Sequence, residues 1–562
     1  MRLFLSLVSL CFFTLFTGAQ IQPYRYNSVK KVVAQKGAVV SAHPLASAVG
    51  LQILQQGGNA FDAAVATQLA LAVVYPGAGN LGGGGFLLGY TSNGKAIALD
   101  FREKAPAAAR HDMYLDSNGN PIAQKSQYGH LASGVPGTVS GIFSTLPYTR
   151  LPFKKLIEPA IELAQKGFAI TEAEARNLNG AMGSFIQYST RHHAFIRYGG
   201  WKAGDTLTQP QLAATLERIR KNGRREFYEG KTAQLLVAEM KRGGGLISYD
   251  DMKNYQTAIR EVMRCDYRGY AIIGMPLVSS GGILIQQMLG MTQFYPISTY
   301  GFQTANAIQL MVEVQRRAFA DRAEYLGDVD FVPVPVRALT STSYLQQRME
   351  DFVPGKAGNS SITKHGVVPS GSEETTHLSI YDQWGNAVAV TTTLNGNYGN
   401  RTVVGDAGFL LNNEMDDFSS KPGVPNMYGA LGSTANAIEP NKRMLSSMTP
   451  TIVLNENKPF LVLGSPGGTT IPTQVYQVLV NIIDFGMTPE AAVWAPRFHH
   501  QWQPDVVYVE REFPYSVRQA LQAMGYTITE RSSIGRFEAI QITNGTIIAV
   551  ADTRGDDHAA GY

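Results

Sequence analysis

A short stretch of the chain places hydroxyl groups at both ends of a predicted β-hairpin. It runs from Glu373 to Asn395 and reads EETTHLSIYDQWGNAVAVTTTLN. Thr375 and Thr376 stand near its start, and Thr393 closes a run of three threonines at the end of its second arm. Because a hairpin brings its two ends together, we expect these hydroxyl groups to meet at one place. Threonine also has a high β-propensity, so the same residues could serve only as strand residues.

Thr375 follows a polar segment rich in Gly and Ser, residues 355–372, which is typical of a flexible linker. A cut in front of Thr375 would make it an N-terminal residue, whose hydroxyl group is a nucleophile and whose own α-amine is a base. An α-amine has a pKa of about 7.7–8.0, whereas a lysine amine, at about 10.4, stays mostly charged at neutral pH. The hairpin taken alone favours the plainer interpretation, that of ordinary strand residues.

Composition and charge restrict the classes of function. The chain has 562 residues, of which 44% are hydrophobic and 16% charged, as in a soluble globular protein with a large core. Its net charge of +4 comes without a long basic run, which argues against a nucleic-acid-binding surface. The tripeptide RGD at 554–556 occurs readily by chance, and we give it no functional weight.

Motifs for cofactors and metals are not supported by their context. The sequence GAGNLG at 77–82 matches the glycine pattern of dinucleotide-binding loops. Those loops need a strand before them and a helix after them, and the predicted order here is the reverse. His499 and His500 are adjacent, whereas helical zinc ligands are spaced i, i+4. We therefore expect no metal and no organic cofactor.

The N-terminus has the features of a secretory signal peptide. Arg2 precedes an apolar run from 3 to 16, and small residues lead to a cleavage site after Ala19. Removal of residues 1–19 leaves Cys265 as the only cysteine, so no internal disulfide can form. We expect an exported protein of the periplasm or the exterior, in which Cys265 has a structural role.

The pattern of predicted elements is of the α+β class. Residues 43–76 read as two helices, the second capped by Asn59, and a β-hairpin turns at 92–94. The middle third, about 151–345, is mostly helical. A second hairpin turns at 455–457, and the rest of the chain alternates between strands and helices.

Several long motifs then occur in a recognisable order. After GNLGGGGF and DFREKAP come the hairpin, GFLLNNEMDDFS, NKRMLSSMTPTIV and GSPGG. From about Val39 to Tyr562 the chain resembles the γ-glutamyltranspeptidases, or glutathione hydrolases, of the N-terminal-nucleophile hydrolase superfamily. The resemblance implies a four-layer αββα sandwich. It also implies a precursor that cuts itself into a large subunit, 20–374, and a small catalytic subunit, 375–562, which together form one interwoven domain.

The resemblance also implies roles for individual residues. Thr375 would attack the carbonyl of Glu374 during maturation and later the γ-amide of the substrate, with Thr393 orienting it. Tyr428, in a segment similar to the lid loop of bacterial members, would cover the substrate. The α-carboxylate of the γ-glutamyl group would be bound by Arg102, Ser446 and Ser447, its α-ammonium by Asn395, Glu414 and Asp417, and the oxyanion by the N–H groups of Gly467 and Gly468.

The implied activity is cleavage of the γ-glutamyl amide of glutathione and transfer of the γ-glutamyl group to water, amino acids or peptides. One alternative is a related amidase that acts on another acyl group, such as a β-lactam side chain or poly-γ-glutamate. The set of Arg102, Asp417 and the two serines favours a γ-glutamyl group. A second alternative is a secreted binding protein that keeps the fold, which the presence of Thr375, Thr393 and the glycine pair disfavours.

Overall fold

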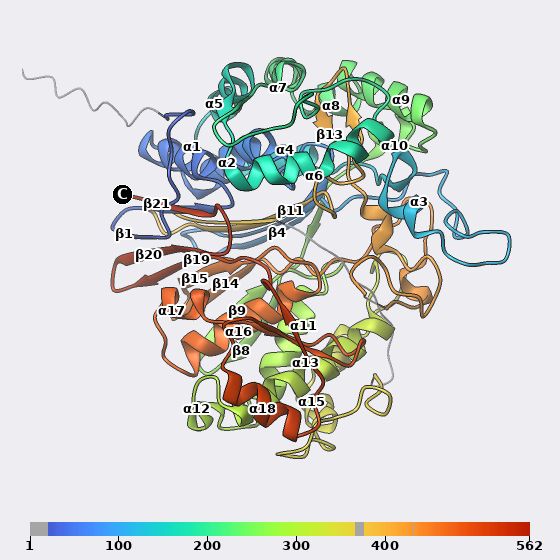
Figure 1. The fold of residues 1–562 in the computed structure, drawn as a ribbon. Coiled ribbons are helices and arrows are strands. Elements are labelled where there is room, and N and C mark those ends of the chain that lie inside the picture. The colour runs from blue at the N-terminus through green and yellow to red at the C-terminus, as the bar shows by residue number, and fades with distance from the viewer. Residues whose placement is uncertain (1–20, 366–375, 430) are drawn as a thin grey trace, which may run out of the picture.

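The computed structural model describes residues 21–365, 376–429 and 431–562. Two seven-stranded sheets are stacked in the middle of the molecule, and helices cover the outer face of each (Figure 1). Neighbouring strands in both sheets run antiparallel, so their pairing needs no crossover helices. The architecture is the predicted α+β sandwich with four layers, αββα.

The first sheet contains the hairpin of residues 376–393. Its β10 lies between β2 and β11, with Thr376 opposite Thr392 and Tyr381 opposite Ala387. Strands from both sides of position 375 are therefore interleaved in one sheet. The strand order is β21 (His558–Gly561), β2 (Ala38–Ser41), β10 (Thr376–Tyr381), β11 (Ala387–Thr393), β3 (Gly84–Tyr90), β4 (Ala96–Asp100) and β7 (Ala258–Arg260).

The second sheet packs against the first, with β14 and β15 next to β11. Its hairpin turns where predicted, because β14 ends at Asn455 and β15 begins at Lys458. The order is β1 (Lys31–Ala34), β20 (Thr546–Ala551), β19 (Glu538–Thr543), β15 (Lys458–Gly464), β14 (Thr451–Asn455), β9 (Tyr270–Gly274) and β8 (Met263–Tyr267). The smaller sheets are β12 (Val403–Val404) with β13 (Phe409–Leu410), β16 (Phe498–His499) with β17 (Val507–Glu510) and β18 (Ile528–Arg531), and β5 (Phe168–Ala169) with β6 (Thr206–Leu207).

The helices form the two outer layers (Figure 1). Those over the first sheet are α1 (Pro44–Gln55), α2 (Ala60–Val74), α4 (Thr138–Thr145), α5 (Phe153–Lys166), α6 (Glu172–Tyr188), α7 (Pro210–Asn222), α8 (Arg224–Tyr228), α9 (Lys231–Gly243) and α10 (Tyr249–Asn254). Those over the second are α11 (Gly281–Thr292), α12 (Ile297–Tyr300), α13 (Ala305–Tyr325), α15 (Thr342–Arg348), α16 (Thr470–Ile483), α17 (Pro489–Trp494) and α18 (Tyr515–Ala523). The short helices α3 (Ala123–Gln127) and α14 (Val336–Leu339) and the 3₁₀ turns η1 (His130–Ala132), η2 (Leu146–Tyr148), η3 (Glu414–Asp417) and η4 (Thr434–Asn436) complete the chain's helical parts.

Local sequence signals explain how the central elements begin. The Asn59 side chain accepts hydrogen bonds from the N–H groups of Phe61 and Asp62, and the Asp62 carboxylate accepts one from the N–H of Asn59 (2.8 Å). This capping box starts α2 at the predicted place. Every residue of α2 is buried, since the helix lies between β10 and β11 on one side and α5 on the other.

The predicted linker is held in place over residues 355–365. The N–H groups of Gly358 and Ser360 donate to Glu313 (2.9 Å) and Asp505 (2.7 Å). Both acceptors belong to parts of the chain that are distant in sequence, so composition alone could not indicate this attachment. The rest of the predicted linker lies outside the described residues.

The predicted signal peptide, residues 1–19, also lies outside the described residues. Within the described ranges, no helix is both long and apolar enough to pass through a bilayer. Cys265 lies in β8, where burial raises the pKa of its thiol to about 12. The thiol therefore stays protonated at neutral pH, which agrees with a structural residue.

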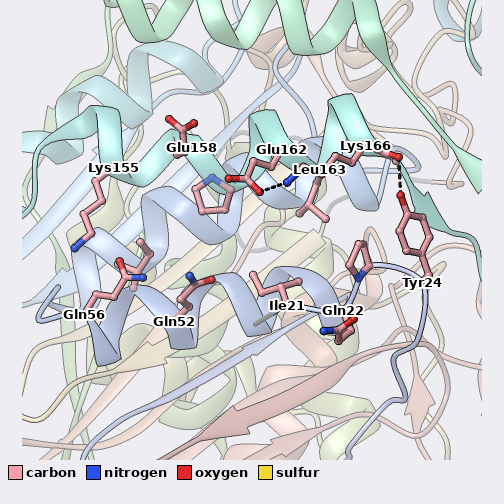
Figure 2. Close-up of a pocket in the computed structure, with 14 residues that line it drawn as sticks. Ile21, Gln22, Tyr24, Gln52, Gln56, Lys155, Glu158, Glu162, Leu163 and Lys166 are labelled. Atoms are coloured by element: carbon pink, nitrogen blue, oxygen red, sulfur yellow. Dashed lines mark hydrogen bonds and ion pairs between the residues drawn. The ribbon is translucent and has the colours of Figure 1, made fainter. Parts of the chain in front are cut away.

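A cavity of about 420 Å³ lies between α1, α5 and the segment that follows residue 20 (Figure 2). The Tyr24 hydroxyl donates to the Lys166 carbonyl (2.8 Å) at one end, and Lys166 pairs with Glu162 (2.8 Å). No residue that the sequence analysis assigned to a catalytic or binding role lines this cavity.

Candidate functional site

The described part of the hairpin ends beside a buried polar cluster. Thr376, the residue after Thr375, pairs with Thr392, the residue before Thr393. The Thr393 hydroxyl accepts a hydrogen bond from the N–H of Asn395 (2.7 Å), and it lies close enough to the Glu414 carboxyl group to oppose the rise in the pKa of that group. Glu374 and Thr375 themselves lie outside the described residues.

Arg102 follows the end of β4, and its side chain is fully buried. Its two terminal nitrogens lie 2.5 Å from carboxylate oxygens of Glu414 and of Asp417. Its Nε donates to the Met444 carbonyl (3.2 Å) and one terminal nitrogen donates to the Leu445 carbonyl (3.3 Å). A guanidinium group with partners in several directions is held in a single orientation.

The site contains a third carboxyl group, which the sequence analysis missed. Glu103 is fully buried, and its Oε2 lies 3.6 Å from the guanidinium of Arg102. Burial raises the pKa of Glu103 well above its usual value, and the nearby Glu414 raises it further. Burial also raises the pKa of Glu414, an effect that Arg102 opposes. The residue was missed because a charged residue next to an arginine is usually an exposed partner.

Asn395 supplies a buried oxygen next to this cluster. Its backbone has a φ of +68°, which an asparagine tolerates better than most residues. The side-chain nitrogen donates to the Asn413 carbonyl (3.0 Å), which fixes the orientation of the amide. The Asn395 Oδ1 is buried and has no hydrogen-bond partner within the described ranges, so it is available to a donor such as an ammonium group.

Ser446 and Ser447 are buried directly after the two carbonyls that bind Arg102. The Ser446 hydroxyl accepts from the N–H of Met448 (3.2 Å), and the Ser447 hydroxyl accepts from Arg322 (2.9 Å). Arg322 lies near the end of α13 and was not singled out from the sequence. Its helix carries several charged residues, and no sequence signal distinguishes the buried arginines from exposed ones.

Gly467 and Gly468 form the loop between β15 and α16. Their φ angles are +129° and +64°, in the region that favours glycine. A Cβ atom on Gly467 would lie only 2.6 Å from the Thr470 hydroxyl and 2.9 Å from the Gln474 amide. In the part of the chain that the structure describes, neither amide N–H has an acceptor, which suits a site for an oxyanion.

The predicted lid segment, residues 419–443, is attached to the same 3₁₀ turn that carries Glu414 and Asp417. The N–H of Met427 donates to Asp416 (3.1 Å), and the Asn436 amide donates to the Asp417 carbonyl (2.6 Å).

The lid segment is also tied to the glycine loop. The Gln501 amide donates to the Tyr428 carbonyl (3.4 Å) and accepts from the Thr469 hydroxyl (2.6 Å). Tyr428 therefore lies between η3 and the loop of Gly467 and Gly468.

His377 supports the hairpin from the middle of the sandwich. Its ring nitrogens lie 2.9 Å from the Thr391 hydroxyl and 3.0 Å from the Ser379 hydroxyl. Burial lowers its pKa to about 3, so the ring is neutral at physiological pH. A histidine that cannot gain a proton in this range is a structural partner of the two hydroxyl groups rather than an acid or base.

The cluster has the groups needed to bind a small zwitterion. A guanidinium and two serine hydroxyls suit a carboxylate, while the carboxyl groups and the Asn395 oxygen suit an ammonium group. All of them are buried in the sandwich, where charge interactions are stronger than in water. Thr393 at the end of β11 lies beside Glu414, and its neighbour Thr392 pairs with Thr376, so the start of β10 is close to this cluster.

Comparison with known proteins finds the same family that the sequence motifs resemble. The γ-glutamyltranspeptidase family model matches residues 46–562. The chain is 47% identical over 537 residues to the glutathione hydrolase proenzyme of Escherichia coli, covering 94% of this chain and 93% of the relative.

Among solved structures, the Helicobacter pylori γ-glutamyltranspeptidase is similar with 41% identity and a TM-score of 0.57, covering 61% of this chain and 97% of that one. The cephalosporin acylase of Bacillus halodurans is similar with 26% identity and a TM-score of 0.84, covering 97% and 99%.

Proposed function

Because the chain belongs to the γ-glutamyltranspeptidase family, we propose that it is a self-processing glutathione hydrolase and γ-glutamyltransferase. It cleaves the γ-glutamyl amide of glutathione and related compounds and passes the acyl group to water, amino acids or peptides. The observation that carries this proposal is the buried cluster of Arg102, Glu414 and Asp417 beside Thr393. The cluster can hold the α-carboxylate and α-ammonium of a γ-glutamyl group at the end of the predicted nucleophile's hairpin.

Maturation would begin with the Thr375 hydroxyl attacking the carbonyl carbon of Glu374. The peptide C–N bond breaks as the ester C–O bond forms, and the nitrogen takes the hydroxyl proton. Water then hydrolyses the ester, which leaves a carboxylate on Glu374 and a free α-amine on Thr375. The products are a large subunit, 20–374, and a small subunit, 375–562. Export and removal of residues 1–19 come before this cut.

Turnover uses the same hydroxyl group. The α-amine of Thr375 takes the hydroxyl proton while the oxygen attacks the γ-carbonyl carbon of the substrate. The N–H groups of Gly467 and Gly468 stabilise the oxyanion, and Thr393 orients the nucleophile. The proton passes to the leaving nitrogen, so that Cys-Gly departs from a γ-glutamyl-Thr375 ester. Water or the amine of an acceptor then attacks this ester and restores the enzyme.

Substrate binding divides the cluster into two halves. Arg102, Ser446 and Ser447 receive the α-carboxylate, while Asn395, Glu414 and Asp417 receive the α-ammonium. Burial raises the pKa of the sequence neighbour Glu103 well above its ordinary value, which favours its protonated form. No metal or organic cofactor takes part in the proposed reaction.

Intact masses of the purified protein under denaturing conditions test self-processing directly. We expect two chains, of which the shorter begins at Thr375. A single chain of residues 20–562 that nevertheless hydrolyses γ-glutamyl-p-nitroanilide would contradict the N-terminal nucleophile. A single inactive chain would show that the protein lacks the proposed chemistry.

A second prediction concerns Tyr428 in the lid segment. Replacement with alanine removes the aromatic ring but keeps the backbone carbonyl that Gln501 binds. We expect the KM for γ-glutamyl-p-nitroanilide to rise by about threefold to tenfold, or bulkier γ-glutamyl substrates to gain relative to small ones. Steady-state kinetics on a short and a long γ-glutamyl substrate measure this effect. Unchanged values for both would show that Tyr428 does not cover the site.

The likeness to a cephalosporin acylase supports the alternative of another amidase. The two functions differ in the need for an α-ammonium group. A glutaryl p-nitroanilide carries the carboxylate but lacks the ammonium, so a γ-glutamyl enzyme should strongly prefer the γ-glutamyl compound. Equal rates on both compounds would favour the acylase.

A further inference from the structure

Arg401 lies in the loop that follows β11, in the stretch between Thr393 and β12. Its side chain is half-buried, and its Nε is buried without a hydrogen-bond partner in the described ranges. No carboxylate of the described residues forms an ion pair with it. Burial lowers the pKa of Arg401, which reflects the cost of keeping this charge away from water.

An aromatic ring lies beside this guanidinium. The Tyr398 ring centre lies 5.5 Å from its central carbon, and Tyr128 and Tyr428 are its other ionisable neighbours. Tyr428 belongs to the lid segment. Tyr128 stacks on Tyr188, with ring centres 5.5 Å apart and an angle of 11° between the ring planes.

A cavity of about 580 Å³ lies next to the backbone of Arg401. Tyr128, Tyr188 and Ser189 line it, and the Ser189 hydroxyl donates to the Arg401 carbonyl (3.4 Å). Its volume lies in the range of pockets that take small molecules. The backbone of Arg401 is thus bonded to the wall of this cavity, while its guanidinium has Tyr428 of the lid segment as a neighbour.

The same loop forms part of the rim of the candidate site. The N–H of Gly396 donates to the Asn413 side chain (2.8 Å), next to the turn that carries Glu414. A Cβ on Gly396 would lie 3.5 Å from the methyl group of Met427, the neighbour of Tyr428. The loop that carries Arg401, η3 and the lid segment therefore meet.

We propose that Arg401 binds the terminal carboxylate of the peptide on the far side of the scissile amide. This carboxylate belongs to the leaving dipeptide during acylation and to a peptide acceptor during transfer. The proposal rests on the proposed function, in which Arg102 already serves the α-carboxylate of the γ-glutamyl group. A substrate with a second carboxylate needs a second cation, and a guanidinium matches a carboxylate with two parallel hydrogen bonds.

The test compares substrates that differ in this carboxylate alone. Glutathione has it, glutathione amidated at its glycine lacks its charge, and γ-glutamyl-p-nitroanilide lacks the dipeptide entirely. For the mature two-chain enzyme we expect a higher kcat/KM for glutathione than for its amide. Arg401→Gln should lower the ratio of kcat/KM for glutathione to that for the anilide by about tenfold to a hundredfold. In this variant glutathione and its amide should become equivalent, and Arg401→Lys should recover part of the preference.

Arg191→Gln is the matched control, because Arg191 is a nearby exposed arginine that is already paired with Asp406 (3.2 Å). It should leave all three substrates unchanged. A fall of equal size for all substrates in Arg401→Gln would show a purely structural role and overturn the proposal, as would an unchanged ratio. A wild-type enzyme that cleaves none of the three compounds would instead refute the proposed function.

Discussion

Thr375→Ala is expected to remain a single uncut chain and to lose turnover by roughly 10⁴-fold or more, as expected when a covalent nucleophile is removed. Alanine has no hydroxyl group to attack the carbonyl of Glu374, so the first step of maturation cannot start. Without the cut, residue 375 has no free α-amine, so the base of the turnover reaction is missing as well. Denaturing mass spectrometry and γ-glutamyl-p-nitroanilide hydrolysis measure the two losses on one sample.

Two further variants make this result specific. Thr375→Ser keeps a hydroxyl group and should keep both reactions at reduced rates. Thr376→Val is the matched control, since the Thr376 hydroxyl is buried without a hydrogen-bond partner among the described residues and valine has nearly its shape. It should be cut and active. Cleavage of the Thr375→Ala chain at its normal position would show that the Thr375 hydroxyl is not needed for maturation.

Local signals in the sequence were sufficient for most of the individual elements. Asn59 forms the predicted cap of α2, and the turn at 455–457 joins β14 to β15. Both depend on contacts between residues close together in the chain. The four-layer arrangement came from the resemblance, because the order of strands in a sheet depends on pairing between distant segments, such as β2 with β10.

The parts of the site that were missed all depend on tertiary burial. Glu103 follows Arg102 directly, yet nothing in DFREKAP indicates that both side chains are removed from water. Arg322 reaches Ser447 from α13, across 125 residues of sequence. The attachment of residues 355–365 to Glu313 and Asp505 has the same origin. A polar composition predicted a linker there, whereas backbone hydrogen bonds to buried or distant carboxylates hold the segment down.

Arg102→Gln is expected to lower kcat/KM for γ-glutamyl substrates by roughly 10²–10³-fold, because truncating one partner of a buried charge pair costs about 2–5 kcal/mol. Glutamine cannot offer two parallel charged hydrogen bonds to the α-carboxylate of the substrate. The same change leaves Glu414 and Asp417 without the guanidinium that now lies 2.5 Å from each. The free energy of unfolding should therefore fall by about 3–5 kcal/mol.

The loss of stability should depend on pH in a defined direction. Arg102 now opposes the rise that burial causes in the pKa of Glu414, so its removal raises that pKa further above the unfolded value. A carboxyl group with a raised folded pKa binds a proton more tightly in the folded state. Its contribution to stability is complete below the unfolded pKa and declines as the pH rises through the folded pKa. Calorimetry should show a Tm for Arg102→Gln that falls more steeply than the wild-type Tm as the pH rises above the ordinary carboxyl pKa of 4.5.

The double variant Arg102→Gln with Asp417→Asn separates binding from stability. Asparagine removes one of the buried carboxylates that Arg102→Gln leaves without a counter-charge, so part of the lost Tm should return. Activity should not return, because the double variant has lost groups for both the α-carboxylate and the α-ammonium. A double variant as unstable as Arg102→Gln would show that the Asp417 charge is not what destabilises the single variant. Recovery of activity would show that this cluster does not bind the substrate.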